Sequence, residues 1–354
     1  MTIVFILIAI LLFSFLIFVH ELGHFLTAKW LGVQVNEFSL CMGPAIWQRK
    51  KGETLYSIRA IPIGGYCAME GEDEESANPR AFTSAAWWRR IIILAAGAFM
   101  NFLAGFVMVA LLLTTYSGFT DLTISGFFDN GQLEAQGLEV GDRLYALDGE
   151  RLYLSNDLEM LAARDSDGVY DLTVVRDGEK VVLEDFVLQK DYYALDGQTV
   201  YLYGLNLTAE AKTVGTVLKN AWYNCLDFVR IVRMGLQDLL SGAAGLNDMA
   251  GVVGIVDVIT ETGTSSPTVG IGLLNILYLG AFIAVNLAVM NLLPIPALDG
   301  GRIVCLLLTV LVEKVTRRKL NPKYEGYLHA AGMVALLALM VYVTFQDVFR
   351  MIGG

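Results

Sequence analysis

Two histidines and a glutamate lie together at the end of an apolar run, in the stretch LIFVHELGHFLTAKW. On a helix, His20 and His24 project from one face, where two neutral imidazoles can bind one Zn²⁺ while Glu21 lies next to a water on the metal. This spacing favours metal-assisted hydrolysis. The five-residue pattern alone is common, but charged groups near the centre of an apolar span cost roughly 2.5–3.5 kcal/mol each. Function therefore explains the three residues better than a cluster that only marks the end of a helix.

Two histidines do not complete a catalytic zinc site, which takes three protein ligands. The third candidate is Asp299, the acidic residue at the end of NLLPIPALDGG. We prefer it to His329, the only other histidine, which lies at the start of the last apolar stretch. Taken alone, Asp299 is also typical of an N-cap for a helix over 301–312. We expect it to be a ligand because His20 and His24 are predicted at a similar depth.

The elements that must position these residues are membrane spans. Apolar residues make up 55% of the 354 and charged residues 17%, which indicates a polytopic membrane protein rather than a soluble domain. Four stretches without charge are long enough to cross the hydrocarbon, namely 1–19, 91–120, 262–298 and 330–346. The third is too long for one ordinary helix and has two prolines near its end, so we expect a broken span with 303–312 as its inner half. The first lacks the features of a cleaved signal peptide and is expected to be retained.

Basic residues predict the orientation of the chain. The connections after the first and third spans contain eight and six Lys or Arg residues, so both are expected to be cytoplasmic. The segment 121–261 then lies outside. It holds 10 basic against 24 acidic residues, which makes binding to nucleic acid or to anionic lipid by this part unfavourable.

The outer segment has the pattern of a small β-domain. VGDRLYALDGERL and YDLTVVRDGEKVVLEDFVL each predict a hairpin around an Asp-Gly turn, and SNDLEMLAARD between them has helical spacing. The run from 131 to 152 resembles a PDZ domain, although Gln132 and Gln136 stand where Pro and Ala are usual. Such a domain either binds peptides or serves as a packing or steric module. The following stretch, 213–242, predicts an amphipathic helix that lies on the outer membrane face or packs against the β-domain.

Four features now occur in one order: HELGH in the first span, IPIGGYCAMEGE after it, the PDZ-like insert, and NLLPIPALDGG in the third span. In this the chain resembles the site-2 protease family of intramembrane zinc metalloproteases, in its bacterial form with a single PDZ domain. The resemblance implies that His20, His24 and Asp299 bind Zn²⁺ and that Glu21 is the catalytic acid and base.

The resemblance also implies how a substrate is held. Asn286 and Asn291 match positions that keep the substrate near the metal, and 58–69 matches a membrane-dipping β-hairpin that pairs with an unwound substrate. The candidate contacts in that hairpin are Ile61, Ile63, Gly64 and Gly65. Two motifs differ from the usual pattern of the family, CMGP at 41–44 and GAFMN at 97–101. We expect neither to touch the metal site.

The expected fold class is a polytopic α-helical membrane protein with about four transmembrane helices, an inserted extracytoplasmic PDZ-like β-domain and a membrane-associated β-hairpin. The expected divisions are transmembrane helix 1 (1–30), the hairpin region (31–88), helix 2 (89–119), the PDZ-like domain (120–205), an amphipathic helical linker (206–265), the broken helix 3 (266–313) and helix 4 (326–349). The acidic run 70–76 is expected to be a solvated loop.

The expected function is hydrolysis of peptide bonds within single-pass transmembrane proteins, such as anti-sigma factors or signal-peptide remnants. The expected location is a bacterial plasma membrane, with the active site near the cytoplasmic side. The lipid bilayer and the membrane substrates are the expected partners, and the oligomeric state is not indicated. Two alternatives remain. Another HExxH membrane peptidase would not be expected to share the Leu-Asp-Gly-Gly segment, and a non-catalytic PDZ adaptor would need neither Glu21 nor zinc.

Overall fold

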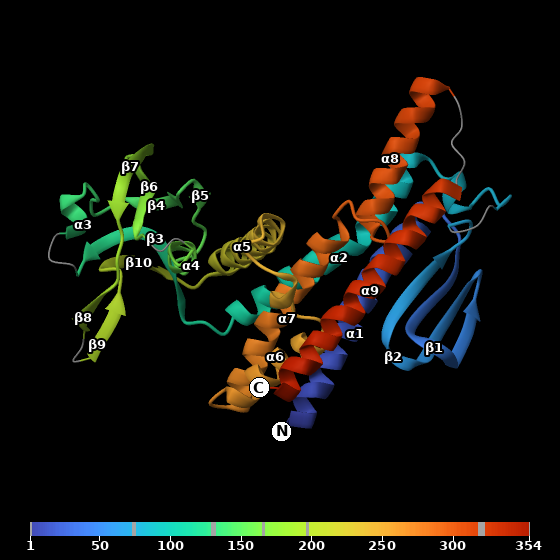
Figure 1. The fold of residues 1–354 in the computed structure, drawn as a ribbon, viewed down its shortest axis with the longest axis horizontal. Coiled ribbons are helices and arrows are strands. Elements are labelled where there is room, and N and C mark those ends of the chain that lie inside the picture. Colours follow the sequence, from blue (N-terminus) through green and yellow to red (C-terminus); the bar gives the residue numbers. More distant parts are fainter. Residues whose placement is uncertain are drawn as a thin grey trace. The chain divides into compact units, whose positions relative to one another are not determined.

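The computed structural model describes residues 2–72, 76–128, 132–164, 167–195, 198–317 and 323–353. The chain divides into two compact units. The first, called here the helical unit, consists of Met1–Val109 and Phe228–Gly354, and the second, the inserted unit, is Ala110–Asp227. Figure 1 shows the long helices of the first and the strands of the second. Both boundaries of the inserted unit fall within helices. The segments that carry the candidate ligands all belong to the helical unit.

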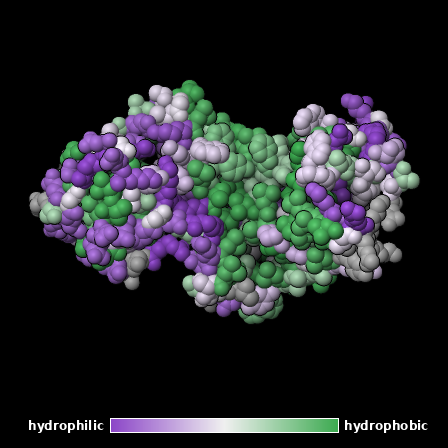
Figure 2. Space-filling view, turned by 90° about the horizontal axis from the view of Figure 1, so that it is seen from above, coloured by the Kyte–Doolittle hydropathy of each residue, from purple (hydrophilic) through white to green (hydrophobic). Residues whose placement is uncertain are grey.

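Among the described residues, four helices are long and apolar enough to cross a membrane, which confirms the expected number of spans. They are α1 (Thr2–Trp30), α2 (Trp87–Leu113), α7 (Val269–Asn291) and most of α9 (Lys323–Gly353). Figure 2 shows a continuous apolar surface over the helices, whereas the inserted unit is largely hydrophilic. An apolar surface of this extent is suited to lipid rather than to water.

The third span ends at the Pro-containing segment, as expected. α7 stops at Asn291 and α8 (Asp299–Thr316) begins after seven intervening residues, which include Pro294 and Pro296, both without a backbone N–H to donate. The expected role of 303–312 as the inner half of this span stays a prediction. α7 alone has 23 residues, about 34 Å at 1.5 Å per residue. It is long enough to span the membrane by itself.

Further helices connect these spans. α5 (Val214–Ser241) is the helix predicted over 213–242, and it is followed by a 3-10 turn η2 (Leu246–Asp248) and by α6 (Val252–Ser265). Gly263 of α6 lies directly against Phe5 of α1. At the other end of α6, Asp347 of α9 accepts hydrogen bonds from the amides of Gly251 and Gly254, at 3.0 and 2.9 Å. A carboxylate at a helix N-terminus satisfies free amides and opposes the helix dipole, so Asp347 fixes α9 to α6.

Two long strands follow α1. β1 (Val35–Lys51) and β2 (Thr54–Met69) form an antiparallel hairpin whose turn lies at Gly52 and Glu53. The stretch 58–69 therefore lies within one strand, β2, and the expectation that it forms a hairpin by itself is wrong. The register is irregular around Pro62, between the pairs Met42 with Ile61 and Leu40 with Gly65. Ser14 of α1 donates a hydrogen bond to the carbonyl of Pro62, at 2.7 Å, so β2 runs against the first span at this point.

The turn of this hairpin is held by ionic contacts. Glu53 lies 2.6 Å from both Lys29 and Arg80. Hydrogen bonds from Arg80 and Lys29 lower the pKa of Glu53 to about 2. A buried apolar cluster joins α1, both strands of the hairpin and α2. It consists of Ala28, Val33, Val35, Phe38, Cys67, Met69, Phe82, Ile93 and Leu94. Phe82 lies in the short 3-10 helix η1 (Phe82–Ser84). This cluster fixes the end of α1, where the two histidines are, relative to α2.

The inserted unit is built on one antiparallel sheet with strand order β10-β3-β4-β6-β7, with β5 paired to β4 and a separate hairpin β8-β9. The strands are β3 (Gly118–Phe127), β4 (Arg143–Leu147), β5 (Glu150–Arg151), β6 (Val169–Arg176), β7 (Glu179–Val187), β8 (Asp191–Leu195), β9 (Gln198–Leu202) and β10 (Leu205–Ala211). Two short helices accompany them, α3 (Gln132–Ala135) and α4 (Asp157–Ala162).

Both hairpins expected in this unit are present. Asp148 and Gly149 have φ of 49° and 77°, and Asp177 and Gly178 have φ of 50° and 86°. Positive φ at both central residues is the type I′ turn, whose twist matches that of the strands it joins, and Asp-Gly is a preferred pair for it. The expected helix over SNDLEMLAARD is α4. The sequence therefore predicted the local structure of this unit from its turns.

Candidate active site

The two histidines lie on one face of α1, one turn apart, and are largely withdrawn from solvent. Their rings meet edge to face, with centroids 4.7 Å apart. His24 is only 5% exposed, and its Nδ1 lies 2.8 Å from the backbone carbonyl of Ile93 on α2. Because a carbonyl only accepts, Nδ1 of His24 carries the proton in this contact, and its Nε2 keeps a lone pair for a metal. A hydrogen bond of this kind is the usual way to orient a metal-binding histidine.

Asp299 completes a triangle with these histidines. Its Oδ2 lies 3.2 Å from Nε2 of His20 and 3.4 Å from Nε2 of His24, and the two Nε2 atoms are 3.2 Å apart. Within the described residues, these three side chains are the group of His, Cys, Asp or Glu that could hold a metal ion. Ligands at about 2.0–2.1 Å from a tetrahedral zinc are separated by roughly 3.3–3.4 Å. The triangle therefore has the size that zinc requires.

The chemistry of the three atoms also fits a cation. With the proton of His24 on Nδ1, its Nε2 lone pair faces the Asp299 carboxylate, so acceptors point at one another. Among the described residues, Oδ2 of Asp299 is buried without a hydrogen-bond partner of acceptable geometry. Buried acceptors left unpaired are costly. A divalent cation bound by Nε2 of both histidines and by Oδ2 would remove this cost.

The segment between α7 and α8 delivers Asp299 to the histidines. A Cβ at Gly300 would lie 2.3 Å from the backbone of Leu292, and one at Gly301 would lie 2.2 Å from the carbonyl oxygen of Ile295. The start of α8 therefore folds back onto the end of α7 in a way that only glycine permits. Asp299 is the first residue of α8 and the N-cap is Leu298. The alternative reading of Asp299 as the N-cap of this helix is therefore wrong.

A glycine of α2 forms one wall of the site. A Cβ at Gly97 would lie 2.4 Å from Nε2 of His24 and 2.7 Å from Cε1 of His20. The expectation that the GAFMN motif does not touch the metal site is therefore wrong, because its first residue lies in contact with both histidines. Opposite it, a Cβ at Gly23 would lie 2.4 Å from the carbonyl oxygen of Ala96. Small residues in apolar spans are a known signal of close helix packing, but this signal does not show that the neighbours of Gly97 are the two histidines.

Glu21 lies beside the metal-binding triangle. It is close enough to interact electrostatically with His20, His24 and Asp299, and it lies next to the backbone of Cys67 in β2. A Cβ at Gly65 would be 3.7 Å from Cγ of Glu21, which is ordinary contact. One carboxylate therefore lies near the candidate ligands and along strand β2.

The remaining predicted substrate-binding residues are placed as follows. Asn286 lies within α7 and Asn291 is its last residue, and both are partly buried. Ile61 is 49% exposed and pairs with Met42, and Gly64, with φ of 86°, lies against the Met42 side chain. For Ile63 the structure describes the backbone, which is part of β2, but the side chain lies outside the described residues. Of the hairpin residues, Gly65 is the one that the structure brings to Glu21.

A further contact joins the hairpin to α8. Arg302 forms an ion pair with Glu72, just after β2, and Glu72 also accepts a hydrogen bond from the amide of Met69. The Glu72 side chain is only 15% exposed. The expectation of a purely solvated acidic loop is therefore wrong for Glu72, while residues 73–75 lie outside the described residues. Sequence reasoning missed this pair because its members are 230 positions apart.

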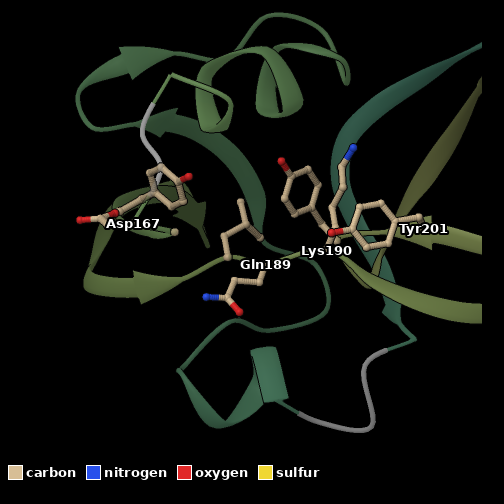
Figure 3. A pocket seen from close by; sticks show the side chains of 8 residues that line it. Asp167, Gln189, Lys190 and Tyr201 are labelled. Carbon is tan, nitrogen blue, oxygen red and sulfur yellow. The ribbon is translucent and has the colours of Figure 1, made fainter.

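The inserted unit contains a cavity of about 350 Å³ beside Asp167, Gln189, Lys190 and Tyr201. Figure 3 shows that the polar ends of Asp167, Gln189 and Lys190 point in different directions rather than toward one point. Lys190 forms an ion pair with Glu159, and Asp167 accepts a hydrogen bond from the amide of Val169. These groups do not converge on one point, unlike His20, His24 and Asp299.

Comparison with known proteins agrees with this geometry. The model of peptidase family M50 matches residues 8–339. A Fusobacterium nucleatum protein named as a zinc metalloprotease is 35% identical over 98% of this chain and 98% of its own, and a Clostridium perfringens protein named in the same way is 33% identical over 97% and 98%. The regulator of sigma-W protease RasP from Bacillus subtilis is 26% identical over 97% of each chain. These matches extend over nearly the whole sequence, and they show that this chain belongs to peptidase family M50, the site-2 protease family of zinc metalloproteases.

Proposed function

We propose that this zinc metalloendopeptidase hydrolyses peptide bonds within the membrane-spanning segments of other membrane proteins. The observation that carries the proposal is the position of the candidate ligands. His20 and His24 lie on α1, an apolar helix long enough to span a membrane, and Asp299 reaches them from the break after α7, another such helix. Membership of the family excludes the alternative readings of a non-catalytic adaptor and of another class of HExxH peptidase.

In this proposal His20, His24 and Asp299 hold the zinc ion through Nε2, Nε2 and Oδ2. The ion supplies Lewis acidity, which makes water acidic near neutral pH and withdraws electrons from a peptide carbonyl. The hydrogen bond from Nδ1 of His24 to the Ile93 carbonyl keeps the ring in the tautomer that binds metal. Gly97 leaves the space in which both rings stand side by side.

Glu21 moves the protons. Its carboxylate accepts a proton from the attacking water, whose oxygen forms a bond to the carbonyl carbon of the substrate. The same carboxyl group then donates that proton to the nitrogen of the leaving amine as the C–N bond breaks. The proton balance closes on one residue, which is why a single glutamate beside the ligands is sufficient.

A helical substrate must unwind before it is cut, because its carbonyls are engaged in the helix. In the described part of the chain, β2 pairs only with β1 as a strand, and its Gly65 lies beside Glu21. An unwound segment that added to β2 as a further strand would satisfy its backbone groups there and present a carbonyl near the metal. The segment 58–69 and the amides of Asn286 and Asn291 are the proposed holders of the substrate.

The proposed orientation follows the basic loops, with the inserted unit outside and the active site toward the cytoplasmic side of a bacterial plasma membrane. The inserted unit is proposed to be a PDZ-like domain that selects substrates by size or by capture of a cut end. The name of the Bacillus subtilis relative includes regulation of sigma-W. Single-pass membrane proteins of the anti-sigma type are therefore the first substrates to test.

The experiment is to map the cut. A single-pass substrate is incubated with the purified protein in detergent, and the products are analysed by mass spectrometry. The expected cut lies within the apolar segment of the substrate, and helix-breaking residues near it should raise the rate. A cut confined to residues outside that segment would contradict intramembrane hydrolysis.

A further inference from the structure

The turn that precedes Asp299 is unusual in its backbone. Ala297 has φ of 80°, a conformation that residues with a side chain rarely adopt. It lies between Pro296, which has no N–H, and Leu298, whose amide bonds to the carbonyl of Ile295. The conformation of Ala297 directs the chain into α8, and Asp299 is only two residues away. A strained residue persists only where its surroundings hold it in place.

The group that holds Ala297 comes from α9. The amide of Ala297 donates a hydrogen bond to Nδ1 of His329, at 3.0 Å. One turn further along α9, a Cβ at Gly332 would lie 2.5 Å from Cβ of Pro296 and 2.6 Å from its carbonyl oxygen. Residues three apart lie on the same face of a helix. One face of α9 therefore meets the turn twice, with a polar contact at Ala297 and with close packing at Pro296.

The direction of the hydrogen bond determines which ring nitrogen of His329 can carry a proton. Because the amide of Ala297 is the donor, Nδ1 of His329 must carry a lone pair, so any ring proton lies on Nε2. The imidazole serves as an acceptor on a rigid ring, and its position along α9 sets the position of one peptide group. His329 is not part of the metal-binding triangle, so any effect on the metal passes through the turn.

We propose that His329 is a positioning residue for Asp299. By accepting the hydrogen bond from Ala297, it holds the turn in the conformation that brings Oδ2 of Asp299 within 3.4 Å of both histidines. The inference rests on the proposed role of Asp299 as a zinc ligand. In this proposal the last span, α9, supplies no zinc ligand but supports zinc binding through the turn before Asp299.

The alternative is that α9 supports the turn by packing alone. Two substitutions separate the possibilities. In His329→Asn the side-chain oxygen lies close to the position of Nδ1 and can accept the same hydrogen bond, whereas in His329→Leu the volume is kept and the acceptor is lost. His329→Gln places its oxygen one bond farther away, near the position of Nε2, and is the matched polar control.

The experiment measures zinc affinity of the full-length protein in detergent by competition with a chelator, with thermal unfolding and helix content recorded for each variant. His329→Leu and His329→Gln should bind zinc about 10-fold more weakly, the lower end of the effect seen for groups that support metal ligands. The zinc affinity of His329→Asn should stay within about twofold of that of the unsubstituted protein, because this variant keeps the hydrogen-bond acceptor that supports the ligand. Asp299→Asn serves as the reference for loss of a ligand.

The outcomes distinguish this inference from the proposed ligand set. If Asp299→Asn binds zinc as tightly as the unsubstituted protein, the ligand assignment fails. If Asp299→Asn weakens binding but His329→Leu does not, the positioning role is overturned while the ligand set stands. Equal losses in His329→Asn and His329→Leu would also overturn it, because the acceptor would then be irrelevant.

Discussion

Substitution of Gly97 by alanine should disable the metal site with one methyl group. That methyl would lie 2.4 Å from Nε2 of His24, where ordinary contact begins at about 3.4 Å. The ring or helix α2 must therefore move by about 1 Å. Metal–ligand distances tolerate deviations of only about 0.2 Å, so a shift of this size removes His24 from the geometry that the triangle now has.

The expected loss can be given as a range. Disturbing a group that orients a metal ligand typically costs 10–100-fold in metal affinity or activity, and a misplacement of about 1 Å can cost 10²-fold in rate. We expect Gly97→Ala to bind zinc at least 10-fold more weakly and to cleave about 100-fold more slowly. Zinc affinity by chelator competition and the initial rate of cleavage measure the two effects separately.

Gly105 on the same face of α2 provides the matched control. Its Cβ would lie 2.7 Å from Cγ2 of Val285 on α7, so Gly105→Ala crowds a helix contact to a similar degree without touching a histidine. Overpacking of either kind should cost roughly 1–3 kcal/mol of stability, but zinc affinity should fall only in Gly97→Ala. Equal zinc affinity in the two variants would refute the reasoning that Gly97 acts through the metal site.

Three further predictions concern the hairpin and the topology. At the turn of the hairpin, the pKa of Glu53 lies below its ordinary value, so its ion pairs contribute fully to stability above about pH 4.5, and this contribution is lost as the pH falls toward 2. Glu53→Gln should flatten this part of the profile of thermal stability against pH by up to about 1 kcal/mol. An unchanged profile would exclude these ion pairs as the cause. In the strand proposed to receive substrate, Ile63→Pro removes an amide donor and should abolish cleavage with zinc retained, whereas Ile63→Val should remain active; equal rates for the two, with folding verified, would refute strand addition at this position. A cysteine at Ser155 should react with an impermeant reagent applied outside the cell and one at Ser76 should not, and the reverse pattern would place the inserted unit in the cytoplasm.

The sequence predicted most of what depends on local pattern. The four apolar helices follow from their length, and the hairpins of the inserted unit follow from Asp177-Gly178 and its counterpart at Asp148-Gly149. His20 and His24 could be paired from their spacing alone. Asp299 could be proposed as their partner because an acidic residue after two prolines in an apolar stretch requires an explanation.

Contacts between distant segments could not be predicted in this way. Gly97 looks like any small residue of an apolar helix until α2 is placed against α1. The hydrogen bond between Ala297 and His329 joins the turn before α8 to α9. It depends on a positive φ at Ala297, which the sequence pattern does not predict for an alanine. The extent of β1 and β2 was also missed, because the family resemblance placed a β-hairpin over 58–69, where the structure has part of one long strand with an irregular register.

The most direct test of the account measures zinc content and cleavage rate together in Glu21→Gln. This change is nearly isosteric and leaves His20, His24 and Asp299 in place, but an amide cannot accept the proton of the attacking water. We predict about one zinc per chain, as in the unsubstituted protein, with a cleavage rate reduced by roughly 10²–10⁴-fold. A variant that retains zinc and still cleaves its substrate at a rate near that of the unsubstituted protein would contradict the role of Glu21 and the mechanism built on it.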